Sequence, residues 1–187
     1  MTRTFEHTGS VPFDHAYWVI PQQFLAGCCP GSENRAHARR QLNSLIDHGI
    51  RQVINLMESD ELDWYGRGFV PYENRIKSIA RSRGLSISVD HMPIRDRWIP
   101  SRIDMCRILD RIDQCITENK PVYIHCLGGL GRTGTVVGCY LARHGIKAGR
   151  ALLTMIQDLR QNTSTHNLTS PETNQQVDLV LSWVAGE

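Results

Sequence analysis

A cysteine and an arginine that flank a glycine-rich loop are the residues of this chain best suited to chemistry. Cys126 follows an apolar run that predicts a buried strand, and Arg132 begins a predicted helix. Gly128, Gly129 and Gly131 allow the positive φ angles with which a tight loop turns its N–H groups inward. Because unpaired N–H groups and the helix dipole both attract negative charge, the loop predicts an anion site.

The same field should stabilise a thiolate on Cys126 and lower its pKa well below the usual value of about 8.5. Arg132 adds a planar fork of donors that fits two phosphate oxygens. We therefore expect Cys126 to attack a phosphate ester and Arg132 to bind its oxygens. The other expected phosphate ligands are the loop amides of Leu127, Gly128, Gly129, Leu130 and Gly131. A buried structural cysteine in a turn is the alternative, and the flanking strand, histidine and helix disfavour it.

The run from His125 to Gly134, His-Cys-Leu-Gly-Gly-Leu-Gly-Arg-Thr-Gly, resembles the signature loop of the cysteine-based protein tyrosine and dual-specificity phosphatases. It is similar to that of small prokaryotic-type members close to kinase-associated phosphatase. The resemblance implies a phosphotyrosine protein phosphatase-like fold and hydrolysis of phosphate monoesters through a cysteinyl-phosphate, with no metal or cofactor. We expect His125 to orient the loop by hydrogen bonds. Thr133 would donate a hydrogen bond to the sulfur, cap the helix start, or do both.

Phosphoryl transfer to sulfur also needs an acid that protonates the leaving oxygen. Asp96 lies in the connection after a predicted strand, at the same sheet edge as Cys126. The stretch Pro-Ile-Arg-Asp at 93–96 resembles the family's acid loop, and the separation of 126 − 96 = 30 residues is similar to that in dual-specificity phosphatases. Repulsion from the phosphate dianion would keep this carboxyl protonated, provided that Arg95 and Arg97 point outward.

Other roles remain open for the carboxylates and for a late glutamine. Asp96 could cap its loop, and Asp90 is the second candidate for the acid. Asp104 is better explained as part of a helix cap with Ser101. The run from Ser170 to Gln176 resembles the family's glutamine loop, in which a glutamine places the hydrolytic water. Glu172 stands where tyrosine-specific members carry the first glutamine, and Gln176 could equally be a polar surface residue.

The substrate is less clearly encoded. Leu127 and Leu130 stand where phosphoinositide phosphatases of the phosphatase-and-tensin type carry lysines, so a lipid or inositol phosphate is the less favoured substrate. The loop 57–72 contains Trp64, Tyr65, Phe69 and Tyr72, which could deepen the pocket for phosphotyrosine. We expect phosphotyrosine first and phosphoserine or phosphothreonine second. The rival classes are a phosphate-binding module without turnover and a redox or arsenate-reducing thiol protein.

Apolar runs and helical periodicities alternate along the middle of the chain, and helices cluster at its end. Strands are predicted over 17–20, 24–27, 52–56, 85–89 and 122–124, and helices over 35–48, 71–83, 132–144, after Ser101, around 152–159 and from Ser170 with Pro171 at the first position. This order predicts an α/β fold with a mostly parallel sheet and helices on both faces. Residues 1–16 are predicted to form a loosely ordered lead, and 17–187 a single phosphatase domain.

Composition sets further limits on function. The chain has 187 residues and a formal net charge of +2, too small to predict bulk binding to nucleic acid or membranes. The apolar run 135–142 is shorter than the ~20 residues that span a bilayer. Cysteines in such a chain are expected as thiols, and the adjacent Cys28 and Cys29 lack a metal-ligand spacing. We expect a cytoplasmic monomer that acts on a phosphoprotein and uses no metal.

Overall fold

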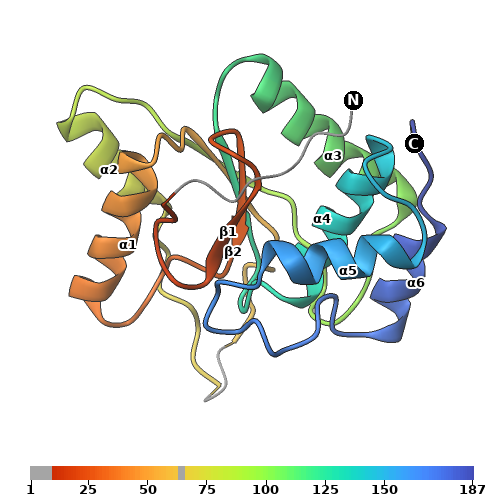
Figure 1. Cartoon of the computed structure of the whole chain (residues 1–187). Coiled ribbons are helices and arrows are strands. Elements are labelled where there is room, and N and C mark those ends of the chain that lie inside the picture. Colours follow the sequence, from red (N-terminus) through yellow and green to blue (C-terminus); the bar gives the residue numbers. More distant parts are fainter. Residues whose placement is uncertain (1–9, 63–65) are drawn as a thin grey trace.

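Residues 10–62 and 66–187, which the computed structural model describes, fold around a five-stranded sheet (Figure 1). The strands, in their order across the sheet, are β1 (Ala16–Ile20), β2 (Phe24–Gly27), β5 (Val122–His125), β3 (Gln52–Asn55) and β4 (Ser88–His91). β1 pairs antiparallel with β2, and every other neighbouring pair is parallel. The predicted mostly parallel α/β sheet is confirmed.

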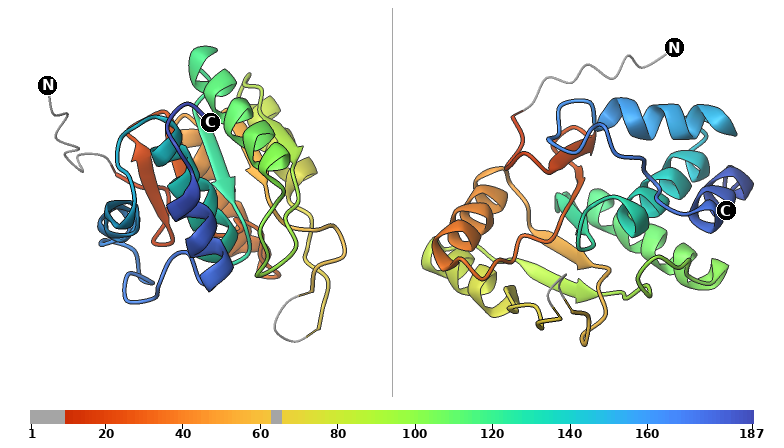
Figure 2. Two further views of the ribbon diagram at one scale, coloured as in Figure 1. Left: turned by 90° about the vertical axis from the view of Figure 1, so that its right-hand side faces the viewer. Right: turned by 90° about the horizontal axis from the view of Figure 1, so that it is seen from below.

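Helices cover both faces of this sheet (Figures 1 and 2). α1 (Arg35–Asp47) and α2 (Glu73–Ser82) share a core with Val53 and Tyr123. The helices of the other face are α3 (Arg102–Thr117), α4 (Gly131–Arg143), α5 (Arg150–Leu159) and α6 (Asn174–Ser182). They share a core with Ile54 and Ile124. Because successive strand residues point to opposite faces, β1, β2, β3 and β5 each contribute to both cores, whereas β4 contributes Val89 to the first alone.

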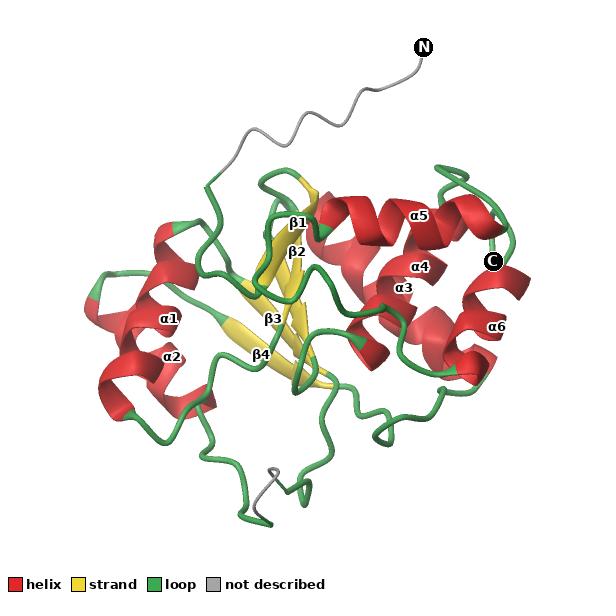
Figure 3. Cartoon of the chain, turned by 60° about the horizontal axis from the view of Figure 1, so that its bottom comes forward, coloured by secondary structure: helices red, strands yellow, loops and turns green. Residues whose placement is uncertain are grey.

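The carboxyl ends of the four parallel strands meet at one edge of the sheet. The connections that follow them, residues 28–34, 56–72, 92–101 and 126–130, gather at this edge (Figure 3). β5 lies between β2 and β3, so the loop that begins at Cys126 has a connection on either side. Parallel α/β sheets bind their ligands at such an edge. Within the described ranges, no helix combines the length and apolar character that crossing a membrane would require.

Two elements begin three residues later than the sequence predicts. β4 starts at Ser88 and not at Leu85, because Ser88 is the first residue in register with Gln52 of β3. α6 starts at Asn174, so the predicted start at Ser170 and Pro171 is wrong. Thr173 and Gln176 form a reciprocal capping box, which satisfies the first amides of the helix. The Ser170 hydroxyl instead donates to the Leu130 carbonyl oxygen at 2.8 Å.

Part of the predicted N-terminal lead contacts the rest of the protein. The Ser44 hydroxyl of α1 donates to the Pro12 carbonyl oxygen at 2.8 Å, and the Trp18 indole donates to that of Ser10 at 3.1 Å. Residues 1–9 of the lead lie outside the described ranges. The division into a lead and one domain stays a prediction.

Candidate active site

The signature loop joins the end of β5 to the first turn of α4. Cys126 directly follows β5 and is 3% exposed. In the part of the chain that the structure describes, the amides of Leu127 to Leu130 have no hydrogen-bond acceptor. These amides and the N-terminus of α4 therefore remain available to an anion.

Two of the loop glycines are required for different reasons. Gly129 has a φ of 74°, and a Cβ there would lie 2.6 Å from the backbone carbon of Gly27. A Cβ on Gly131 would lie 2.4 Å from Oε2 of Glu172 and 3.0 Å from Oε1 of Gln176. Gly128 has open space around it and no positive φ. Of the three glycines, which all allow a positive φ, only Gly129 adopts one.

Arg132 is 2% exposed, and its guanidinium is surrounded by acceptors. Nη1 and Nη2 donate to the two carboxylate oxygens of Glu61 at 2.6 and 2.7 Å. Nη1 also lies 3.1 Å from the Ile94 carbonyl oxygen and 3.4 Å from that of Leu56. Burial alone would lower the pKa of Arg132, but the hydrogen bonds and charge of Glu61 raise it above its ordinary value. The guanidinium is therefore charged and fixed in direction.

The structure brings Asp96 to the same guanidinium. Oδ1 of Asp96 lies 3.1 Å from Nη2 of Arg132, although the Asp96 side chain is 55% exposed. Arg95 and Arg97 are exposed, and the Arg95 guanidinium stacks over the Trp98 ring at 4.9 Å. Asp90, the second candidate, pairs with Arg111 at 2.6 Å. Asp104 belongs to the helix cap expected with Ser101, whose side chain accepts from the Asp104 amide.

Gln176 connects the acid loop to α6. Its Oε1 accepts from the amides of Glu172 and Thr173, and its Nε2 donates to the Trp98 carbonyl oxygen at 3.2 Å. The residue is fully buried, so the polar surface role weighed for it is wrong. It lies against Gly131 of the signature loop. Because both ends of the amide are occupied, its role in placing water stays a prediction.

His125 supports the loop from below the cysteine. Burial lowers the pKa of His125 to about 3, so its imidazole is neutral near pH 7. Nδ1 lies 3.1 Å from the Cys126 carbonyl oxygen, and Nε2 lies 2.5 Å from the Tyr72 hydroxyl. A carbonyl can only accept, so the proton is on Nδ1 and Tyr72 donates to Nε2. These bonds fit the orienting role expected of His125.

Thr133 contacts the backbone at the end of β2. It is fully buried, and its hydroxyl lies 3.4 Å from the Gly27 carbonyl oxygen at the end of β2. The N-cap of α4 is Leu130, so Thr133 does not cap the helix start either. A hydrogen bond from Thr133 to the sulfur stays a prediction.

The aromatic residues of the 57–72 loop differ in position. Trp64 and Tyr65 lie outside the described residues. Phe69 is half-buried, whereas Tyr72 is buried and its ring packs edge-on against that of His125. Tyr72 therefore supports the signature loop and does not form a pocket wall.

Sequence reasoning missed Glu61 and the role of Tyr72. A signal for Glu61 was present, because a buried arginine requires a carboxylate partner and the connection after β3 is acidic at Glu58, Asp60 and Glu61. No comparable signal identifies Tyr72, since its contact with His125 depends on the placement of α2. Among the described residues, no group of three or more His, Cys, Asp or Glu side chains is placed to hold a metal.

The chain matches a protein family model and several known proteins. Residues 29–146 match the family model "Polymorphic toxin system, DSP-PTPase phosphatase". The dual specificity protein phosphatase CDC14B of Mus musculus is 28% identical over 149 residues, which are 75% of this chain and 26% of that protein. Cyclin-dependent kinase inhibitor 3 of Sus scrofa is 30% identical over 123 residues, 64% of this chain and 54% of that protein. The phosphatidylglycerophosphate phosphatase PTPMT1 of Arabidopsis thaliana is 31% identical over 93 residues, 48% of this chain and 27% of that protein.

These matches span about half or less of the relatives' own lengths. Among solved structures, Tk-PTP in its active form superposes with a TM-score of 0.65 at 26% identity, over 89% of this chain and 93% of that one. PTPMT1 in complex with PI(5)P superposes with a TM-score of 0.64 at 16% identity, over 91% and 94%, and shows the shared fold. The chain therefore belongs to the DSP-PTPase phosphatase family of polymorphic toxin systems, within the cysteine-based tyrosine phosphatase superfamily.

Proposed function

We propose that the protein hydrolyses phosphate monoesters on other proteins, phosphotyrosine first, through a cysteinyl-phosphate on Cys126. One observation carries the proposal: two connections bring a cysteine, an arginine and an aspartate together at one sheet edge. Cys126 begins the loop that ends at Arg132, and Asp96 reaches Arg132 at 3.1 Å from the connection after β4. A phosphate-binding module would need the cradle but not the carboxylate.

The proposed reaction has two steps. The Cys126 sulfur attacks phosphorus, the P–O bond to the leaving group breaks, and Asp96 gives its proton to the leaving oxygen. Water then attacks the phosphorus of the cysteinyl-phosphate, Asp96 takes a proton from that water, and the P–S bond breaks. Arg132 and the loop amides bind the equatorial oxygens in both steps. The incoming phosphoryl oxygens replace Asp96 at Nη2 of Arg132, which frees the carboxyl group for proton transfer.

Phosphotyrosine is proposed because Cys126 is 3% exposed, and a buried sulfur favours a long, flat side chain. The competing class is a phospholipid or an inositol phosphate. The Arabidopsis relative is a phosphatidylglycerophosphate phosphatase, and PTPMT1 forms a complex with PI(5)P, so this second class is supported for those proteins. Leu127 and Leu130 offer no charge to additional phosphates, which favours the protein substrate. We further propose that the enzyme acts in the cytoplasm as a monomer.

Hydrolysis of two aryl phosphates by the wild type, Cys126→Ser and Asp96→Asn tests the mechanism. Cys126→Ser should lose all activity on both substrates. Asp96→Asn should lose about 10²-fold or more on phenyl phosphate, whose leaving group needs a proton. It should lose far less on p-nitrophenyl phosphate, whose leaving group does not. Equal losses on both substrates would remove Asp96 from the acid role.

Substrate class is tested with matched substrates. The wild type is given phosphotyrosine and phosphothreonine peptides of the same sequence, and phosphoinositide vesicles. We expect the highest kcat/KM for the phosphotyrosine peptide. Comparable turnover of both peptides would contradict a deep pocket, and a higher kcat/KM on vesicles would favour the lipid class.

A further inference from the structure

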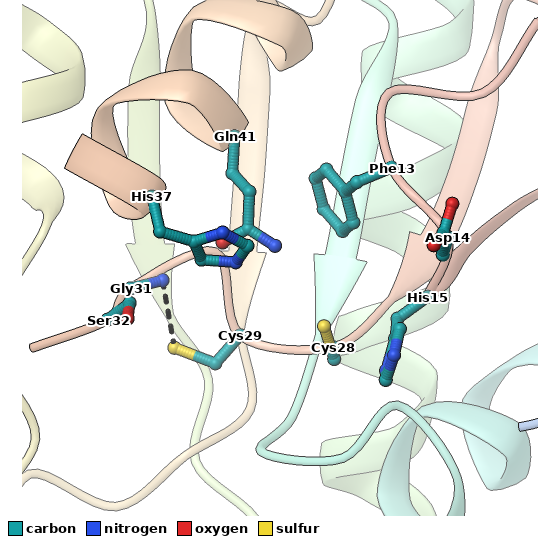
Figure 4. A pocket seen from close by; sticks show the side chains of 9 residues that line it. All are labelled: Phe13, Asp14, His15, Cys28, Cys29, Gly31, Ser32, His37 and Gln41. Atoms are coloured by element: carbon teal, nitrogen blue, oxygen red, sulfur yellow. Dashed lines mark hydrogen bonds between the residues drawn. The ribbon is translucent and has the colours of Figure 1, made fainter. Parts of the chain in front are cut away.

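A cavity of about 390 Å³ lies beside the signature loop at the same sheet edge. Residues 13–15, residues 28–32 and the first turns of α1 form its walls. Figure 4 shows His37 and Gln41 of α1 opposite Phe13 and Cys28. None of these residues has a part in the proposed reaction, so the cavity is separate from the phosphate site.

The cavity and the signature loop share one stretch of backbone. The Cys29 amide donates to the Leu127 carbonyl oxygen at 3.0 Å, and Gly129 packs against the backbone of Gly27 and Cys28. β2 and β5 are adjacent parallel strands, about 4.8 Å apart. An extended peptide advances about 3.3 Å per residue, so the residues that flank a phosphorylated side chain bound at Cys126 would pass the end of the adjacent strand, where the cavity lies.

The residues that line the cavity favour a substrate side chain that accepts hydrogen bonds. His15, His37 and Gln41 can each donate one, and Phe13 supplies an apolar wall. Burial raises the pKa of the Cys28 and Cys29 thiols to about 12, so neither is negatively charged near pH 7. Asp14 is the single acidic residue of the lining.

Helix α1, which lies beside the cavity, carries three arginines in its first turns. Arg35, Arg39 and Arg40 are exposed in the first turns of α1 and form no ion pair within the described part of the chain. A cation in the first turn of a helix opposes the helix dipole, which makes the position of Arg35 unfavourable for the isolated fold. Arg40 follows His37 by three residues and so lies beside it on the helix surface. An anionic partner would offset this unfavourable arrangement.

We propose that this cavity is a specificity subsite that takes an aspartate or glutamate side chain of the substrate polypeptide, within about three residues of the phosphorylated residue. The acidic side chain would accept hydrogen bonds from His37 and Gln41 and be attracted by Arg40. This inference rests on the proposed phosphatase function and adds a preference for acidic flanking sequence.

Phosphotyrosine peptides with glutamate, glutamine or lysine at each of three positions on either side provide the test. For the wild type we expect kcat/KM to be about three- to tenfold higher with glutamate than with lysine at one or two positions. Arg40→Glu should abolish or invert this preference, and Asp14→Asn should strengthen it. Because Arg40 is exposed and unpaired, its substitution should leave folding intact.

Lys147→Glu is the matched control. It makes the same change in net charge in the exposed turn before α5, at the far end of α4, and should leave the preference unchanged. His37→Ala with Gln41→Ala should reduce the difference between glutamate and glutamine. Raising the salt to about 0.5 M should shrink the preference, since exposed charges are screened.

Two outcomes overturn the inference. One is equal kcat/KM for glutamate and lysine at every position, and the other is a preference that Arg40→Glu leaves unchanged. Hydrolysis of p-nitrophenyl phosphate separates these failures from failure of the proposed function. If that activity is present while the peptide preference is absent, only the subsite is wrong. If it is absent, the phosphatase assignment of the site fails first.

Discussion

The guanidinium of Arg132 and the carboxylate of Asp96 both belong to the proposed phosphate site but are held in opposite ways. Arg132 is 2% exposed and donates to both oxygens of Glu61 and to two backbone carbonyls. The Asp96 side chain is 55% exposed and contacts Arg132 at 3.1 Å, on a connection that Gln176 holds at Trp98. The proposed binding group is thus fixed, whereas the proposed proton donor has room to move.

This difference suits the two tasks. Charge stabilisation at the transition state is strongest when donors need no reorganisation, which a buried and fully bonded guanidinium provides. A proton donor must first leave Arg132 and later face a water molecule, so it benefits from an adjustable loop. Substitutions in the two regions should therefore impair activity in different ways. The following variants test that contrast, from the largest expected effect to the smallest.

Arg132→Lys should have the largest effect. Lysine keeps the charge but cannot bind two phosphate oxygens and both Glu61 oxygens at once. We expect kcat/KM to fall by about 10³-fold on any aryl phosphate, whatever its leaving group. Steady-state kinetics on phenyl and p-nitrophenyl phosphate measure this. Arg143→Lys, at the other end of the same helix, is the control and should keep full activity. A loss confined to phenyl phosphate would contradict the contrast.

Glu61→Gln should affect both stability and activity. The substitution leaves a buried guanidinium with less compensation, which should lower the free energy of unfolding by about 3 kcal/mol. Loss of the bidentate hydrogen bonding between Glu61 and Arg132 should also lower kcat/KM by about tenfold or more, equally on both aryl phosphates. Denaturant unfolding and kinetics give the two values. Asp60→Asn, at the exposed neighbouring residue, should change neither. Unchanged stability would show that Glu61 is not required to fix Arg132.

The pH dependence of stability should report on His125. Its pKa is about 3 in the folded protein, against about 6.5 in an unfolded chain. Below pH 6.5 the unfolded chain therefore binds a proton that the folded protein does not, and the free energy of unfolding falls with falling pH. Between pH 6.5 and 5 this amounts to about 2 kcal/mol. Denaturant unfolding of the wild type and of His125→Asn isolates the contribution, because the variant should lack it. Parallel curves would contradict a buried neutral imidazole.

Gln176→Met should have the smallest effect on the kinetics and should act there through the acid loop. Methionine keeps the length of the side chain but removes the hydrogen bond to the Trp98 carbonyl, together with the capping bonds to the Glu172 and Thr173 amides. We expect kcat to fall about fivefold on phenyl phosphate and little on p-nitrophenyl phosphate, about 1 kcal/mol of barrier for the proton-dependent substrate. Gln175→Met, at an exposed neighbour, should leave both unchanged. Equal losses on the two substrates would mean that Gln176 acts on the signature loop instead.

The parts of the site formed by residues that lie close together in the sequence were predictable from it. Cys126 and Arg132 belong to one short loop between a strand and a helix, so their spacing determines their arrangement. Asp96 could be placed because the carboxyl ends of parallel strands share an edge, although its contact with Arg132 could not be foreseen. Glu61 and Tyr72 were missed because their partners lie far away in sequence and meet them only after the long connection folds.

The errors in the fold have the same origin. Leu85 looked like the start of a strand, but pairing with β3 selects Ser88. Ser170 and Pro171 matched the pattern of a helix start, yet the capping box at Thr173 and Gln176 determines where α6 begins. The Ser170 hydroxyl instead donates to the Leu130 carbonyl oxygen of the signature loop. Local patterns identified the elements, and tertiary partners determined where they begin.

The close approach of Gly129 to Gly27 and Cys28 has a practical consequence for anyone trimming this protein. The family match starts at residue 29, so β1, β2 and the backbone against which the catalytic loop rests all lie upstream of it. A fragment cut at that boundary would keep Cys126, Arg132 and Asp96 and still lose the backbone against which Gly129 packs. Expression boundaries should therefore be set before β1, and a shorter version that binds no phosphate would say nothing about the chemistry of the intact chain.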